Sequence, residues 1–312
     1  MPGHTKILKA FTLVCTTLMH TAQAQMPQVS TGKLTRHADM PSKHVTQRHV
    51  DVWLPEGYDG TRKHAVLYMH DGQMLYDSNT TWNKQAWEVD DVLGRLIATG
   101  QVEPTIVVGV WNGGTTRHAD YFPEKPFESL PSSFTDSLVS SGNRPNGAKL
   151  FAEPVKSDGY LKFLTEELKP FIDKNYATHT DAAHTFVMGS SMGGLISMYA
   201  ICEYPRVFGG AACLSTHWPG IFSIENNPVP QAFLNYLDTH LPNPKNHKIY
   251  FDYGTATLDA LYPPLQQQAD AVMKKNKWTS KNWVTLAFEG ADHSEKAWNA
   301  RLEKPLLFLL KR

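Results

Sequence analysis

The sequence predicts an α/β protein with a mostly parallel central sheet and helices on both of its faces. Short apolar segments of strand length alternate along the chain with longer amphipathic ones, the pattern of successive strand–helix units. Several of the short segments are apolar almost throughout, as expected of parallel strands covered on both faces. No repeat, low-complexity tract or long linker interrupts the alternation, so residues 25–312 are predicted to form a single domain.

Seven segments are predicted to be strands of this sheet. Most carry the β-branched and aromatic residues that favour a pleated, buried surface. In chain order they are residues 49–55, 64–70, 105–111, 184–190, 208–215, 248–254 and 282–288.

Helices are predicted between these strands. The clearest covers residues 158–174, where apolar side chains recur at helical spacing, with Asp158 in the place of an N-cap. The other predicted helices are 86–98, 192–203, 230–241 and 265–275, and a further helix is expected to begin at Ser294. One segment, 113–157, is rich in Gly, Pro, Ser and Asn. A structureless loop of that length is unusual in a compact domain, so we expect it to be an excursion over the active-site face.

Residues 1–24 have the pattern of a secretory signal peptide. Lys6 and Lys9 form a short positive region, residues 10–19 are mostly apolar, and 22–24 (Ala-Gln-Ala) offer the small residues of a cleavage site. A membrane anchor is the rival interpretation, but the apolar run is too short to span a bilayer of roughly 30 Å. We therefore expect a periplasmic or secreted protein.

Bulk composition excludes several classes of partner. Hydrophobic residues make up 41% of the chain and charged residues 19%, with 30 basic and 30 acidic side chains. With no basic stripe, neither nucleic acid nor an anionic membrane surface is an expected partner. No spacing typical of a metal site occurs among the fourteen histidines, and no cofactor is expected. Cys202 and Cys213 lie in apolar segments, which favours buried free thiols over a disulfide.

The strongest motif lies at the end of the predicted strand 184–190. The run Gly-Ser-Ser191-Met-Gly stands between an apolar strand and a helix-forming segment, which is the context of a nucleophile elbow. Gly189 and Gly193 are required there because the sharp turn brings neighbouring backbone very close. Ser191 is thus the candidate nucleophile, at a helix N-terminus whose N–H groups point at an incoming oxyanion.

A nucleophilic serine needs a base, and the base needs an acid that orients it. His293 follows the last predicted strand, and Asp259 follows the strand before it, so the chain order is Ser191, Asp259, His293. Asp252 and Asp292 are the alternatives to Asp259. A sequence neighbour of the histidine usually cannot turn its carboxylate onto the adjacent ring, which disfavours Asp292.

The oxyanion formed during ester cleavage needs backbone N–H donors. Met192, the residue after the nucleophile, is expected to supply one of them. The second is expected from the loop after strand 64–70, either from Gln73 or from its neighbour Gly72.

These motifs together resemble the putative-esterase family of α/β-hydrolases. The resemblance rests on YMHDGQ, MGSSMGGLIS, DYGTATLD and DHSEKAW and runs from about residue 45 to the C-terminus. The family includes enterobactin-type siderophore esterases, feruloyl and acetyl-xylan esterases and S-formylglutathione hydrolases. It implies an α/β-hydrolase sheet with little or no separate cap domain, and the roles of Ser191, Asp259 and His293 given above. The signal peptide argues against the cytosolic formylglutathione role.

The predicted function is therefore hydrolysis of a small-molecule carboxylic ester through an acyl-enzyme. A thioesterase, peptidase or acyltransferase would use the same machinery, and a catalytically dead binding protein is the alternative of another class. Tyr121, His217 and Trp218 leave the sheet at the edge where ligands of open α/β folds bind, and are predicted to contact substrate. Their aromatic character favours a short-acyl or aromatic-acyl ester, such as a sugar or siderophore ester. The sequence does not identify the ester or the oligomeric state.

Overall fold

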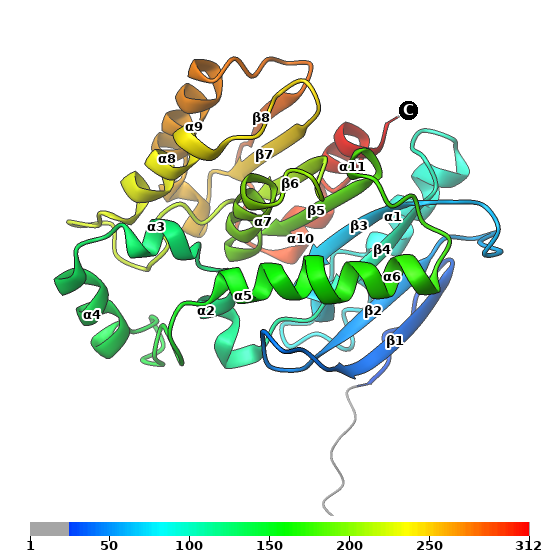
Figure 1. Cartoon of the computed structure of the whole chain (residues 1–312), viewed down its shortest axis with the longest axis horizontal. Coiled ribbons are helices and arrows are strands. Elements are labelled where there is room, and N and C mark those ends of the chain that lie inside the picture. Colours follow the sequence, from blue (N-terminus) through cyan, green and yellow to red (C-terminus); the bar gives the residue numbers. More distant parts are fainter. Residues whose placement is uncertain (1–24, 312) are drawn as a thin grey trace, which may run out of the picture.

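The computed structural model describes residues 25–311, so the predicted signal peptide lies outside the described residues. The described part of the chain forms an eight-stranded sheet in the order β1-β2-β4-β3-β5-β6-β7-β8 (Figure 1). The strands are β1 (Lys33–Met40), β2 (Arg48–Leu54), β3 (Ala65–His70), β4 (Thr105–Val110), β5 (Thr185–Ser190), β6 (Gly210–Leu214), β7 (Lys248–Gly254) and β8 (Trp283–Phe288).

The sheet is mostly parallel, as predicted. β4, β3, β5, β6, β7 and β8 run parallel, whereas β2 is antiparallel to both β1 and β4. Alternate side chains enter two different cores: Val66 and Tyr68 of β3 pack on one face, and Leu67 and Met69 on the other. Both faces are apolar because helices cover both, which explains the uninterrupted apolar runs in the sequence.

β1 is the strand that the sequence pattern did not predict. It lies at the edge of the sheet, and most of its side chains are partly or fully exposed. Lys33 and Asp39 of this strand are exposed to water, and no apolar alternation marks the segment. Arg36 anchors it by an ion pair with the buried Asp51 of β2, in which Arg36 Nε donates to Asp51 Oδ1 over 2.7 Å.

Two groups of helices enclose the sheet. One face carries α2 (Arg117–Tyr121), α5 (Ser157–Lys162), α6 (Lys169–Asn175), α7 (Met192–Glu203), α8 (Val229–His240) and α9 (Pro263–Lys275). The other carries α1 (Val89–Ala98), α10 (Glu295–Asn299) and α11 (Glu303–Leu310). Figure 1 shows α5 and α6 as one long rod, joined by a π-helical segment (Phe163–Leu168). This rod is the predicted helix 158–174, but Asp158 lies in its first turn and is not the N-cap, which is Lys156.

The excursion, in which the sequence predicted no helix, contains three short ones. They are α2, α3 (Glu124–Glu128) and α4 (Ser132–Ser141). Its aromatic residues anchor it: Phe122 is fully buried and contacts the rings of Phe127, Phe151 and Phe233, the last of them in α8. Most polar residues of α3 and α4 are exposed, whereas His118 and Asp120 of α2 are buried.

Cys202 and Cys213 are buried free thiols, as the sequence favoured. Among residues 25–311, no helix is both long and apolar enough to cross a membrane.

Candidate active site

β5, Ser191 and α7 form a sharp strand–turn–helix. β5 ends at Ser190 and α7 begins at Met192, so Ser191 alone occupies the corner. Its φ of 58° and ψ of −121° are strained values for a residue with a Cβ atom. A Cβ on Gly189 would lie 2.8 Å from the backbone of Gly193, so these two glycines allow the crossing that the turn needs.

His293 and Asp259 are brought together from two loops. His293 lies between β8 and α10, and Asp259 lies in a 3-10 helix (Thr257–Leu261) that follows β7. His293 Nδ1 and Asp259 Oδ1 are 2.5 Å apart, and the side chains are 15% and 0% exposed, respectively. Because a carboxylate only accepts hydrogen bonds, this contact places a proton on Nδ1 and leaves Nε2 as the basic nitrogen.

The second oxygen of Asp259 is also held firmly. Oδ2 accepts from Ser215 Oγ over 2.5 Å and from the Gly254 N–H over 2.6 Å. Ser215 Oγ in turn accepts from Trp298 Nε1 and from Arg301 Nη2. This buried network fixes the carboxylate that faces His293.

Neither alternative carboxylate contacts His293. Asp252 is buried and accepts from Arg301 Nη2 over 3.0 Å and from the Tyr250 hydroxyl over 2.9 Å. Asp292 turns away and accepts from Ser294 Oγ over 2.5 Å. Of the three carboxylates considered from the sequence, Asp259 is the one paired with the histidine.

The two predicted oxyanion donors lie at the ends of adjacent strands. Met192 opens α7, and the first N–H groups of a helix have no partner within it. Gln73 lies in a 3-10 helix (Gly72–Met74) directly after β3. Gln73 lines the cavity that also contains Ser191, whereas Gly72 packs against β4, where a Cβ would lie 2.6 Å from the Gly109 backbone. This placement favours Gln73 over Gly72.

Ser191 and His293 line one cavity of about 620 Å³. Its wall combines aromatic rings, amides and charged groups. The lining residues are Asp71, Gln73, Met74, Trp82, Asn83, Gln85, Trp87, Asn112, Arg117, Arg144, Ser190, Ser191, His293, Ser294, Glu295 and Trp298.

The three predicted substrate-contacting residues do not line this cavity. Trp218 is 1% exposed, and its Nε1 donates to Gln266 Oε1 over 2.8 Å. Tyr121 is fully buried, and its hydroxyl accepts from the Asp71 N–H. His217 is also buried, and its backbone N–H donates to the Ser191 carbonyl over 3.2 Å. Tyr121 and His217 thus hold the backbone of two cavity-lining residues, and Trp218 packs in the core, because burying apolar surface is favourable.

Most residues of the cavity wall were not predicted from the sequence. Four lining residues come from the loop after the Gln73 turn, and Trp82 in that loop is 83% exposed. A tryptophan within a polar segment was the sequence feature that could have indicated this wall. Arg117 was also missed; its guanidinium forms two hydrogen bonds to Asp71, of 2.6 and 2.8 Å. Burial opposes ionisation of Asp71, but the Arg117 charge overcomes it and lowers the pKa of that carboxyl.

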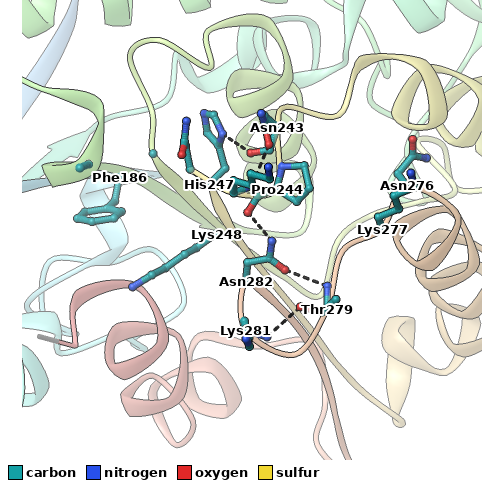
Figure 2. Close-up of a pocket in the computed structure, with 14 residues that line it drawn as sticks. Phe186, Asn243, Pro244, His247, Lys248, Asn276, Lys277, Thr279, Lys281 and Asn282 are labelled. Carbon is teal, nitrogen blue, oxygen red and sulfur yellow. Dashed lines mark hydrogen bonds between the residues drawn. The ribbon is translucent and has the colours of Figure 1, made fainter.

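Two further features lie where the parallel strands begin, at the end of the sheet opposite to Ser191. A pocket of about 730 Å³ opens where β6, β7 and β8 begin, and lysine and asparagine side chains line much of it (Figure 2). His179, Asp181 and His184 precede β5, with ligand atoms within 4.8 Å of one another, a group that could hold a metal ion. Ser191 lies beyond the other end of β5, so neither feature belongs to the candidate active site.

Comparison with known proteins identifies the family. A family model described as "Putative esterase" matches residues 43–309, almost the whole of the described chain. The chain belongs to this family. The match includes the Ser191 turn, the His293–Asp259 pair and the strands that position them, as the resemblance in the sequence implied.

Individual relatives of this esterase-family chain are distant. Ferri-bacillibactin esterase BesA of Bacillus subtilis is 24% identical over 177 residues, 54% of each chain. The first curated relatives are matched over between 51% and 62% of their length. Enterobactin esterase from Shigella flexneri superposes with a TM-score of 0.62 at 17% identity, covering 91% of this chain and 60% of the other. A ferulic acid esterase from Anaeromyces mucronatus gives a TM-score of 0.60 at 18% identity, with coverage of 92% and 93%. These structures confirm the α/β-hydrolase fold.

Proposed function

We propose that this chain is a serine esterase, with Ser191 as nucleophile, His293 as general base and Asp259 as the acid that orients it. The observation that carries the proposal is the arrangement around one cavity. Ser191 stands at a strained turn in the wall, and His293 reaches the same wall while bonded to a buried carboxylate. Membership of an esterase family supports the same reaction.

Acylation is the first half of the reaction. Ser191 Oγ attacks the carbonyl carbon of the ester as its proton passes to His293 Nε2. Asp259 holds the ring through Nδ1 and stabilises the imidazolium that forms. The N–H groups of Met192 and Gln73 donate to the developing oxyanion.

Collapse of the tetrahedral intermediate breaks the ester bond. His293 gives its proton to the departing alcohol, and an acyl group stays on Ser191 Oγ. His293 then takes a proton from water, which attacks the acyl carbon and releases the carboxylic acid. Ser191 recovers its proton, so no other reactant is consumed.

The proposed substrate is a short-acyl or aromatic-acyl ester. Trp82, Trp87 and Trp298 supply aromatic surface in the cavity, and amide and charged side chains lie among them. Such a mixed wall suits a sugar or phenolic ester better than a long aliphatic chain. The similar proteins BesA, named a ferri-bacillibactin esterase, and the ferulic acid esterase are in keeping with this class. Residues 1–24 are proposed to export the enzyme to the periplasm or beyond.

A fluorophosphonate probe tests the proposed mechanism directly. The mature wild-type protein should be labelled, and Ser191→Ala should not, while keeping its thermal unfolding midpoint because alanine still suits the corner. Asp259→Asn should slow labelling by about 10²- to 10⁴-fold, because an amide imposes the wrong imidazole tautomer. Asp292→Asn is the matched control and should label at the wild-type rate. Labelling of Ser191→Ala, or an unchanged rate for Asp259→Asn, would refute these assignments.

A further inference from the structure

Arg144 lines the active-site cavity from a hydrogen-bonded turn in the excursion. Its N–H donates to the Ala148 carbonyl over 2.7 Å, and its own carbonyl accepts from the Gly147 N–H over 2.9 Å. Gly147 has a φ of 82°, which a residue without Cβ adopts easily. Two hydrogen bonds thus hold the backbone of Arg144, and its partly buried side chain lines the same cavity as Ser191 and His293.

The Arg144 guanidinium has no hydrogen-bond or ion-pair partner within residues 25–311. Both carboxylates of the cavity are engaged elsewhere. Asp71 accepts from Arg117 and from Asn112 Nδ2, the latter over 2.6 Å. Glu295 Oε2 accepts from Asn83 Nδ2 over 2.7 Å. All five guanidinium N–H donors of Arg144 remain for a molecule that enters the cavity.

Leaving this charge unpaired is costly. Burial, and then the nearby Arg117 guanidinium, lower the pKa of Arg144, so the surroundings work against its positive charge. Even a partly desolvated cation is less stable without a counter-ion. An anion that binds beside Arg144 would offset this cost. It would then lie in the same cavity as Ser191.

We propose that Arg144 binds an anionic oxygen group of the ester substrate, and that the physiological substrate is an ester bearing a carboxylate. A planar carboxylate matches the guanidinium fork, which donates two parallel hydrogen bonds to it. This inference rests on the proposed esterase function and adds the charge of the substrate to it. Arg144 binds substrate and takes no part in the proton transfers.

The test uses two pairs of esters, and the two members of each pair differ by one negative charge. On the acyl side, the mono-p-nitrophenyl ester of adipic acid is compared with p-nitrophenyl hexanoate. On the alcohol side, para-acetoxybenzoate is compared with its neutral methyl ester. For at least one pair, Arg144→Gln should lower kcat/KM for the anionic ester about tenfold and that for the neutral ester less than about twofold. Arg144→Glu should lower the anionic value further, and added salt should shrink the wild-type preference.

Lys149→Gln is the matched control, because Lys149 is exposed on the same turn and does not line the cavity. It removes the same charge and should leave all four kcat/KM values unchanged. Equal effects of Arg144→Gln on the anionic and neutral esters of both pairs would overturn the inference while leaving the esterase proposal intact. If the wild type hydrolyses none of the four esters, and resists the fluorophosphonate probe as well, the esterase function itself fails.

Discussion

Ser191 is supported by contacts that the turn motif alone does not supply. Its hydroxyl shares a hydrogen bond with the Tyr262 hydroxyl, which lies 2.8 Å from His217 Nδ1. Burial lowers the pKa of His217 to about 3, and burial, together with the charge of Asp259, raises the pKa of Tyr262. Both groups are therefore neutral at working pH. A neutral pair next to the nucleophile positions Oγ without adding charge where the oxyanion forms.

Tyr262→Phe removes this support and keeps the ring. We expect kcat/KM to fall about three- to tenfold, the loss for one neutral hydrogen bond. The fall should be in kcat with KM unchanged, because the hydroxyl orients the nucleophile and is not proposed to touch substrate.

The matched control is Tyr160→Phe. The Tyr160 hydroxyl also lies 2.8 Å from a buried histidine, His70 Nδ1, and burial lowers the pKa of that histidine to about 3 as well. Loss of this second pair should lower the thermal unfolding midpoint with less effect on kcat. Equal losses of kcat in the two variants would show that Tyr262 has only a structural role.

At the scale of elements, the loop at 75–88 forms much of the active-site wall. It follows the 3-10 turn that contains Gln73 and leads into α1. Lys84 and Glu88 adopt positive φ, so the loop has a defined and irregular path. Its Asn83 side chain donates to Glu295 of α10, which ties the loop to the element that follows His293. The exposed Trp82 is thereby held at the cavity.

Trp82→Ala should alter substrate preference more than basal activity. We expect kcat/KM for a p-nitrophenyl ester of a bulky aromatic acid to fall about tenfold, because a ring stacked on the indole loses that contact. The value for p-nitrophenyl acetate, whose acyl group is too small to reach the rim, should change less than about twofold.

Ile224→Ala is the control for Trp82→Ala. Ile224 is another exposed large apolar residue, 60% accessible, and it does not line the cavity. Its loss should leave both kcat/KM values unchanged. A uniform fall on both esters in Trp82→Ala would mean that the loop maintains the active site and does not select the acyl group.

At the scale of the whole molecule, two cores lie on opposite faces of one sheet, and their burial protects both thiols. Cys202 in α7 and Cys213 in β6 belong to the same core, and burial raises the pKa of each. The thiolate is the reactive form of cysteine, so both thiols are unreactive while the core is packed.

Native protein prepared without residues 1–24 should therefore show no reaction with Ellman's reagent, and both thiols should react once denaturant unfolds it. A reductant should leave the thermal unfolding midpoint unchanged, because no disulfide joins the two cysteines. Cys202→Ser, which buries a hydroxyl in place of a thiol, should lower the midpoint. Rapid reaction of one thiol in the native state would show that this core opens locally.

The sequence by itself determined seven of the eight strands, most of the helices and the turn at Ser191. Apolar runs and helical periodicity are local patterns. The glycines two residues before and after Ser191 are also a local pattern, because the backbone of the sharp turn requires them. His293 and Asp259 followed from chain order, since loops after parallel strands meet at one edge of the sheet.

Only the tertiary structure decided which side chains at that edge face the cavity. The pairing of His293 with Asp259 and not Asp252 depends on a buried network through Ser215 and Arg301 that no spacing encodes. Trp218 is covered by packing from later helices, whereas Trp82 is left uncovered, although both are tryptophans in loops. The burial of a residue depends on which distant segments pack against it, and the sequence around that residue does not specify those segments.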